Sequence, residues 1–115
     1  MPLLTLITNL DVTADQQTPL LSTLSTLVAQ LLGKPQSYVM TILQDNQSML
    51  MGGTDEPSAY LQLKSLGLPE DSTTGFSAAL CDTITEQLGI PANRIYIEFS
   101  NPPRHLWGWD RGTFG

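Results

Sequence analysis

Apolar side chains recur along the chain in two patterns. In the first they follow one another almost without interruption, over Leu3–Ile7 and Val39–Leu43, which is typical of strands with both faces covered. In the second they recur about every fourth residue, the spacing of one face of an α-helix. The helical positions are Leu20, Leu24, Val28 and Leu32 in one stripe, and Phe76, Leu80, Ile84 and Leu88 in another. The patterns predict two helices and several strongly buried strands.

The two halves of the chain repeat one another. Residues 32–43 align with residues 88–99 without a gap, at an offset of 56. Extended backwards, the same offset matches both helical stripes and the strands before them, so each half is predicted to be strand, helix, strand. We interpret residues 1–115 as a single domain with internal repeats at about 2–51 and 58–107.

Helix boundaries have recognisable signals. For the first helix we expect Thr18 to cap a helix that has Pro19 at its first position, where a missing N–H is no loss. A start at Thr13 with a capping box is the alternative, and it would leave Pro19 inside the helix. Gly33 and Gly89 each follow a stripe and are expected to end the two helices in a left-handed conformation.

The order of elements predicts the fold class. Two right-handed βαβ units give an α/β (α+β) fold, with a four-stranded mixed sheet and both helices on one face. Short extra strands are expected at 48–51 and 105–109. Because two helices cover one face of the sheet, the apolar residues predicted on the other face require a partner, and self-association is the simplest choice.

Charge excludes one class of partner. The chain has eleven acidic and five basic residues, a net charge of −6 and a pI near 4.3. The basic residues are scattered, whereas nucleic-acid binding needs clustered positive charge. We expect no nucleic-acid partner.

The cysteine and histidine content and the first apolar segment allow predictions about the cellular compartment and about metal binding. Cys81 is the one cysteine, so no internal disulfide can form, and a reducing cytoplasm is expected. The first apolar run lacks a basic flank and contains Thr5 and Thr8, so we predict neither a signal peptide nor a membrane partner. Secretion without a leader sequence stays open as an alternative. His105 is the one histidine, so no metal site is expected.

Pro2 is the candidate for chemistry. If Met1 is removed, the Pro2 nitrogen becomes a secondary amine, and an α-amino group ordinarily has a pKa of about 7.7–8.0. Burial or a nearby cation would lower that pKa, so that the neutral amine is a base at pH 7. The alternative is that Pro2 simply begins a strand, where a missing N–H does no harm.

A set of motifs in a fixed order carries a resemblance. They are Met1-Pro2, Gly33-Lys34-Pro35 with Tyr38, Gly52-Gly53 through Glu56-Pro57, Ser65-Leu66-Gly67, Arg94-Ile95-Tyr96-Ile97, and Gly108-Trp109 to Thr113-Phe114. In these motifs and in its length the chain resembles the tautomerase superfamily, and within it the macrophage migration inhibitory factor family. The resemblance implies a homotrimer whose sheets form a central barrel, with three active sites at subunit interfaces.

The resemblance also implies an activity. It is cofactor-independent keto–enol tautomerisation of phenylpyruvate-like or dopachrome-like substrates, with Pro2 as the catalytic proton carrier. Lys34 would pair with the substrate carboxylate and lower the pKa of Pro2, and backbone N–H groups at Ser65 and Leu66 would orient the substrate. Aromatic side chains would form the walls of the substrate site: Tyr38, Trp107, Trp109, Phe114 and Tyr96 of a neighbouring subunit. The alternative is that these aromatic residues serve only ordinary packing.

Departures from the family pattern keep other functions open. Ser58-Ala59-Tyr60-Leu61 stands where mammalian members have Cys-x-x-Cys, so thiol–disulfide chemistry has no residues here. Glu98 replaces a common asparagine, and a carboxylate near the pocket would raise the pKa of Pro2. The alternative function is a trimeric, cytokine-like protein-binding module with weak or vestigial tautomerase activity. Dehalogenation or decarboxylation, which relies on extra arginines near the proline, is disfavoured because neither strand before a helix carries one.

Overall fold

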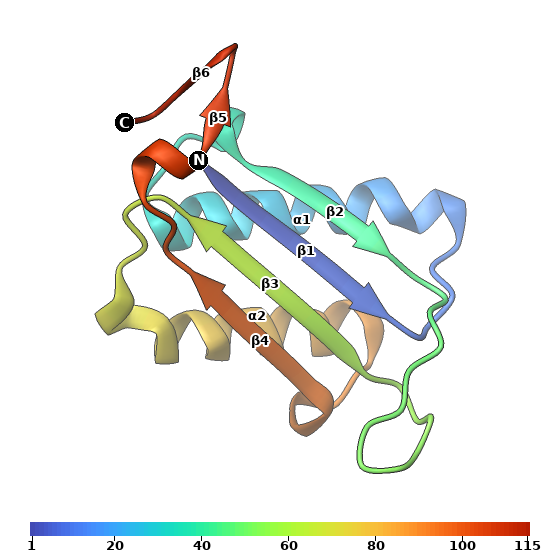
Figure 1. The fold of residues 1–115 in the computed structure, drawn as a ribbon. Coiled ribbons are helices and arrows are strands. Elements are labelled where there is room, and N and C mark those ends of the chain that lie inside the picture. Colours follow the sequence, from blue (N-terminus) through green and yellow to red (C-terminus); the bar gives the residue numbers. More distant parts are fainter.

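Strand β1 (Pro2–Thr8) is hydrogen-bonded on both sides within a four-stranded sheet. The computed structural model describes residues 1–115. The sheet order is β2-β1-β3-β4, in which β1 runs parallel to β2 and antiparallel to β3, and β3 runs parallel to β4. Both helices lie on one face (Figure 1). The bounds are β2 Met40–Gln44, β3 Ala59–Ser65, β4 Ile95–Ser100, α1 Ala14–Leu32 and α2 Thr73–Leu88. The predicted mixed sheet with two helices is confirmed.

The core lies between the sheet and the helices. Burial alternates along β1 and β3, so that one face of each strand is fully covered. The predicted helical stripes supply the other side of this layer, except that Leu88 is only partly buried. Side chains with at most 1% exposure include Leu4, Leu6, Leu61 and Leu63 from the strands and Leu24, Val28, Leu80 and Ile84 from the helices. Each stabilises the fold by about 1.5–3 kcal/mol.

The prediction that α1 begins at Pro19 is wrong. The helix begins at Ala14, with Thr13 as its N-cap residue, and Pro19 lies inside it. The reason is a tertiary contact: Val12 is buried, and its N–H donates to the Asp45 carboxylate at 2.9 Å. This fixes the chain against the sheet just before Thr13. No capping box forms: the Thr13 hydroxyl accepts no backbone N–H, and it donates to the Asp15 carboxylate.

Both helices end as predicted. Gly33 has φ of 61° and Gly89 has φ of 72°, the left-handed conformation that glycine adopts without a Cβ penalty. The Lys34 N–H then returns to the Ala29 carbonyl at 3.0 Å. Neither helix combines the length and apolar content needed to cross a membrane.

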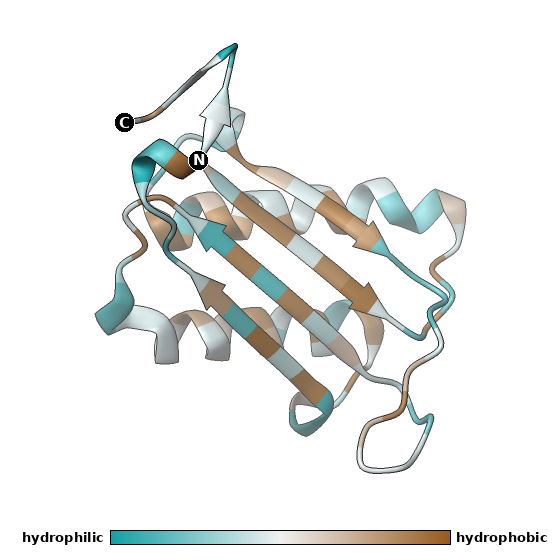
Figure 2. Cartoon of the chain, viewed as in Figure 1, coloured by the Kyte–Doolittle hydropathy of each residue, from teal (hydrophilic) through white to brown (hydrophobic).

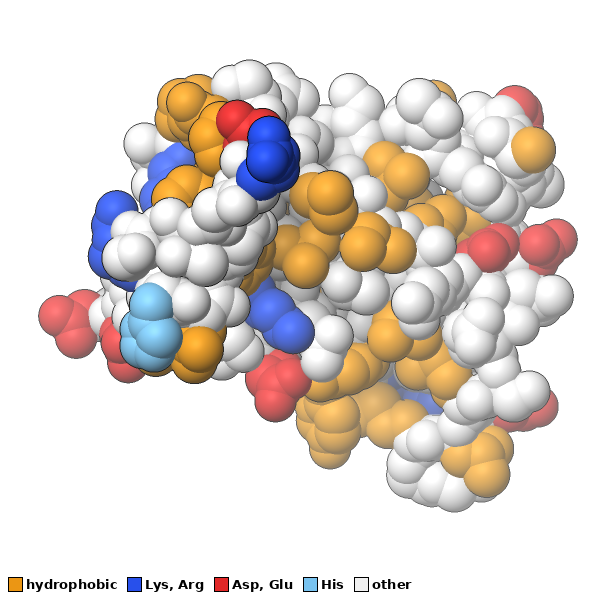
Figure 3. Space-filling model, turned by 45° about the horizontal axis from the view of Figure 1, so that its top comes forward, with side chains coloured by type: hydrophobic (Ala, Val, Ile, Leu, Met, Phe, Trp, Pro, Cys, Tyr) orange, Lys and Arg blue, Asp and Glu red, His pale blue; other side chains and the backbone are white.

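The face of the sheet opposite the helices is divided into two halves. The half formed by β1 and β2 is mostly apolar. Figure 2 shows that both strands are rich in hydrophobic residues, and on the open face 60% of Met40 and 37% of Ile42 are exposed beside the partly exposed Leu3 and Ile7. Figure 3 shows apolar side chains gathered on this open face. We call Leu3, Ile7, Met40 and Ile42 the apolar patch. Exposed apolar groups of this kind are typical of an interaction surface.

The half formed by β3 and β4 carries a polar network. The Tyr60 hydroxyl donates to the Glu98 carboxylate at 2.7 Å, and the Gln62 amide donates to the same carboxylate oxygen at 3.2 Å. The hydrogen bond from Tyr60 lowers the pKa of Glu98, and the same bond raises the pKa of Tyr60. Glu98 therefore accepts hydrogen bonds on the open face of the sheet and does not line the pocket that its own subunit forms around the amino terminus.

Candidate active site at the amino terminus

Four separate parts of the chain meet around the amino terminus. They are the start of β1, the turn after α1, the end of β3 and the C-terminal hairpin of β5 (Gly108–Trp109) and β6 (Gly112–Thr113). Figure 1 shows the amino terminus beside this hairpin. They enclose a hollow of about 470 Å³, lined by Met1, Lys34, Tyr38, Leu66, Gly67, Arg104, Trp109 and Phe114.

Met1 and Pro2 occupy different depths in this site. Pro2 is paired with Ser65 across β1 and β3, and its side chain is fully buried. Met1 lines the hollow, so the amino group there belongs to Met1. Burial lowers the pKa of this amino group, and Lys34, through its charge and a hydrogen bond, and the charge of Arg104 lower it further. The site therefore favours a neutral amine at this end of β1.

Lys34 is held in place by the end of β3. It follows Gly33 directly, and its Nζ donates to Ser65 Oγ at 3.0 Å and to the Leu66 carbonyl. Ser65 is itself buried and donates to the Leu66 carbonyl. Ser65 thus lies behind the hollow and positions Lys34. Since an ammonium group has three N–H donors, Lys34 keeps one for the amine or a ligand.

The C-terminal hairpin supplies a flat aromatic wall. The Trp109 and Phe114 rings are stacked, with centroids 6.1 Å apart and an interplanar angle of 13°. The Phe114 N–H donates to the Trp107 carbonyl at 3.2 Å, and Arg104 Nε donates to the Phe114 carbonyl at 3.0 Å. These bonds turn the tail back over the amino terminus. The short strand expected within 105–109 is thus found at Gly108–Trp109.

Four of the predicted site residues do not line this hollow. Two of them, Pro2 and Ser65, are buried behind it, and the other two are Trp107 and Tyr96. Trp107 is half-buried and contributes its backbone carbonyl to the hairpin. Tyr96 is 68% exposed on β4, where it pairs with Tyr60, whereas Pro2 pairs with Ser65 at the other end of β3. Within one subunit Tyr96 and Pro2 are therefore far apart along the sheet.

Three lining residues were not among the predicted site residues. Met1, Gly67 and Arg104 all face the hollow. The arginine comes from a short 3₁₀ turn, Arg104–Leu106, after β4, and not from a strand that precedes a helix. The sequence signal for Arg104 was its position between Pro102-Pro103 and the aromatic tail. Whether its side chain faces the hollow, however, depends on how the tail folds back.

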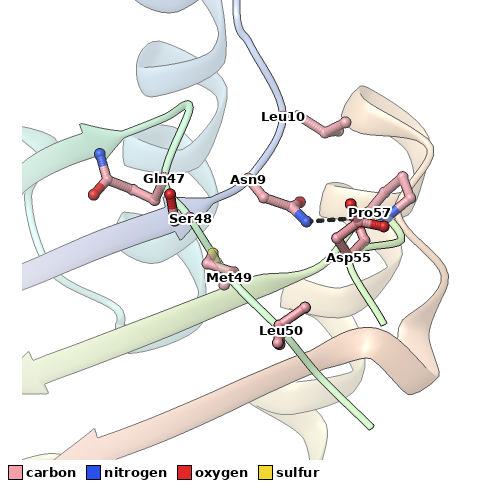
Figure 4. Close-up of a pocket in the computed structure, with 8 residues that line it drawn as sticks. All are labelled: Asn9, Leu10, Gln47, Ser48, Met49, Leu50, Asp55 and Pro57. Carbon is pink, nitrogen blue, oxygen red and sulfur yellow. Dashed lines mark hydrogen bonds between the residues drawn. The ribbon is translucent and has the colours of Figure 1, made fainter. Parts of the chain in front are cut away.

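A second hollow lies at the opposite end of β1. It is lined by Asn9, Leu10, Gln47, Ser48, Met49, Leu50, Asp55 and Pro57 (Figure 4). The Asn9 amide donates to the Asp55 carbonyl at 3.1 Å, so this side chain fastens the loop that joins the two halves. Asp55 is the one ionisable residue in the lining. The hollow therefore lacks paired groups for proton transfer. No three metal-ligating side chains come together anywhere in the structure.

Comparisons with known proteins agree with this geometry. The macrophage migration inhibitory factor family profile matches residues 1–115. A macrophage migration inhibitory factor homolog from Trichinella spiralis is 41% identical, with 99% of this chain and 100% of the relative covered. The Xenopus tropicalis factor is 36% identical, with 99% of each chain covered.

Solved structures show the same fold. The crystal structure of a macrophage migration inhibitory factor homologue from Prochlorococcus marinus superposes with a TM-score of 0.91 and 44% identity, covering 98% of this chain and 99% of the other. The factor from Trichinella spiralis has a TM-score of 0.89 and 37% identity, covering 97% and 99%. The chain therefore belongs to the macrophage migration inhibitory factor family, within the tautomerase superfamily.

Proposed function

We propose that this protein is a cofactor-independent keto–enol tautomerase for phenylpyruvate-like or dopachrome-like substrates, with the Pro2 nitrogen as proton carrier once Met1 is removed. The observation that carries the proposal is the setting of the amino terminus. It lies beside Lys34 in a hollow with aromatic walls, where the pKa of an amino group is lowered. Family membership supports the same type of chemistry.

Removal of Met1 would create the base. With Met1 attached, the Pro2 nitrogen is an amide and cannot accept a proton. Because Pro2 is bonded directly to Met1, removal of Met1 would leave the Pro2 nitrogen next to the space that Met1 fills. The causes that lower the pKa of the Met1 amine, namely burial, Lys34 and Arg104, would then act on the Pro2 amine.

The reaction needs one group to act twice. The neutral Pro2 nitrogen takes the proton from the enol O–H, the C–O bond becomes a carbonyl, and the C=C electron pair moves to the neighbouring carbon. That carbon then takes the proton back from the Pro2 ammonium, so no proton is gained or lost overall. Lys34 would bind the substrate carboxylate, and Tyr38, Trp109 and Phe114 would contact an aromatic ring.

We also propose that three copies of the chain assemble through the open faces of their sheets. The apolar patch supports this, because apolar side chains on a sheet face are seldom left in water. Assembly would explain why Tyr96 is exposed and distant from Pro2 in its own subunit. In a trimer it would be the neighbouring subunit's Tyr96 that reaches the site.

The proposal is tested on protein whose mass shows that Met1 is absent. Ketonisation of the phenylpyruvate enol is followed by absorbance, in parallel with Pro2→Ala and with a sample that retains Met1. General acid–base catalysis contributes about 10²–10⁴-fold, so we expect losses of that size in both comparisons. Equal turnover by the Met1-retaining sample would refute the role of Pro2. A processed trimer without turnover of any enol would favour the protein-binding module.

A further inference from the structure

The hollow at the amino terminus contains a second cation besides Lys34. The chain has a net charge of −6 and five basic residues, yet two of those five, Lys34 and Arg104, line this one hollow. No acidic residue lines it. Positive charge is therefore concentrated at one site of an acidic protein, which favours an anionic ligand there.

The two cations are anchored on different elements. Lys34 is bonded to Ser65 and Leu66 at the end of β3, whereas Arg104 is bonded to Phe114 in the C-terminal tail. Both lower the pKa of the amino group, and Lys34 has the larger effect. A ligand in the hollow thus meets one cation beside the amine and another on the aromatic side of the site.

Arg104 retains donors for a ligand. Its Nε donates to the Phe114 carbonyl at 3.0 Å, and the structure gives its two terminal nitrogens no protein partner. Arg94 shows the contrast, because its Nε and both terminal nitrogens donate to carbonyls of residues 51–57. Arg94 is fully used in holding the fold. The terminal nitrogens of a guanidinium match the two oxygens of a carboxylate.

We propose that Arg104 determines substrate specificity, and that this hollow takes an aromatic enol acid with a second carboxylate. One carboxylate binds Lys34 beside the proton carrier, the ring lies along Trp109 and Phe114, and the second carboxylate binds the terminal nitrogens of Arg104. The inference rests on the proposed function for the identity of the reacting group. It goes beyond that function in assigning a residue and a charge to the substrate.

A purely structural role for Arg104 makes a different prediction. If Arg104 serves only to hold the tail through Phe114, its loss disturbs the aromatic wall and lowers kcat/KM equally for all aromatic substrates. If its terminal nitrogens bind a carboxylate, its loss lowers kcat/KM more for substrates with two carboxylates than for substrates with one. The ratio between two such substrates separates the two roles.

The test uses Met1-free protein and two enols that differ by one carboxylate, those of phenylpyruvate and 4-carboxyphenylpyruvate. We expect the wild type to have a higher kcat/KM for the enol of 4-carboxyphenylpyruvate, chiefly because its KM for that substrate is lower. Arg104→Gln should reduce this preference by about tenfold, the effect of one partly solvated charge-assisted contact. Arg104→Lys should keep part of the preference. Arg111→Gln, which removes the same charge from the same tail outside the hollow, should keep all of it.

A binding measurement separates failure of this inference from failure of the proposed function. Cinnamate and 4-carboxycinnamate do not enolise, and their binding can be followed by tryptophan fluorescence. Preferential binding of 4-carboxycinnamate that is lost in Arg104→Gln supports the inference even if neither enol is turned over. An equal effect of Arg104→Gln on both members of each pair, or no preference in the wild type, overturns it.

Discussion

Lys34 Nζ lies 3.0 Å from Ser65 Oγ, so a residue just past the end of α1 is tied to the last residue of β3. Ser65 is buried and Lys34 reaches the hollow, which makes the serine a support for the lysine. The position of Lys34, the proposed anion-binding group, therefore depends on a side chain that does not line the hollow.

Ser65→Ala tests this support. We expect kcat/KM for phenylpyruvate enol to fall several-fold, with the larger change in KM, because Lys34 keeps its bond to Leu66 but loses one anchor. Loss of the hydrogen bond should also cost about 1 kcal/mol of unfolding free energy. Steady-state kinetics and urea unfolding measure the two effects. Unchanged KM would mean that Leu66 alone positions Lys34.

The pH dependence of activity follows from the lowered pKa of the amino terminus. A base must be neutral, so kcat/KM should rise with pH and level off above a midpoint that lies below the ordinary value of 8.0. Arg104→Gln should move this midpoint to higher pH, because it removes a charge that opposes protonation. A pH profile of kcat/KM on Met1-free protein measures both. A midpoint above 8.0 would contradict the assignment.

The apolar patch predicts the outcome of placing a charge on the open face. Ile42→Asp should dissociate the assembly, because a carboxylate in an apolar interface is strongly unfavourable. Light scattering should give a trimer for the wild type and a monomer for the variant. Thr23→Asp, on an exposed position of α1, is the matched control and should remain trimeric. A trimeric Ile42→Asp would place the interface elsewhere.

Cys81 should react slowly with alkylating agents. Burial raises the pKa of its thiol, and this effect outweighs the lowering by a hydrogen bond with Ser77, while the nearby Asp82 also raises the pKa, so the thiolate is scarce at neutral pH. We expect iodoacetamide to modify native protein more slowly than free cysteine at pH 8, with a rate that continues to rise above pH 9. Mass spectrometry follows the reaction, and protein unfolded in urea is the control. A native rate equal to the unfolded rate would contradict this.

Removal of two neighbouring hydroxyl groups, those of Thr8 and Ser58, should change the free energy of unfolding differently. Thr8 Oγ1 donates to the Ser58 carbonyl at 2.8 Å and accepts from the Leu10 N–H, so Thr8→Val should cost about 1–3 kcal/mol by leaving buried groups unpaired. Ser58 Oγ is buried without a partner, so Ser58→Ala should be neutral or stabilising. Urea unfolding compares the two variants. A larger loss in Ser58→Ala would reveal an unseen partner.

Local signals were readable from the sequence, and tertiary contacts were not. The helical stripes and the left-handed Gly33 and Gly89 depend on spacing and backbone chemistry alone, and they were predicted correctly. The start of α1 was wrong because the contact between Val12 and Asp45 joins residues far apart in the sequence. Arg104 was missed for the same reason, because the orientation of its side chain depends on a hydrogen bond to the carbonyl of Phe114, ten residues later.

The expected aromatic residues were only partly brought together. Tyr38, Trp109 and Phe114 meet at the amino terminus, because the hairpin folds back through Arg104 and Trp107. Tyr96 lies exposed on β4, away from the amino terminus, so one chain alone does not bring it to the site, and its proposed role there depends on the proposed assembly. The polar network of Tyr60 and Glu98 was also invisible, because it depends on the register between β3 and β4.

The full burial of Pro2 beneath Met1 has a consequence for biosynthesis. Once β1 has paired with β3, Pro2 is packed into the sheet and only Met1 remains partly exposed at its end. We therefore expect an aminopeptidase to remove Met1 faster from the nascent chain than from the folded protein. The specific activity of a preparation would then depend on how fast the protein was expressed.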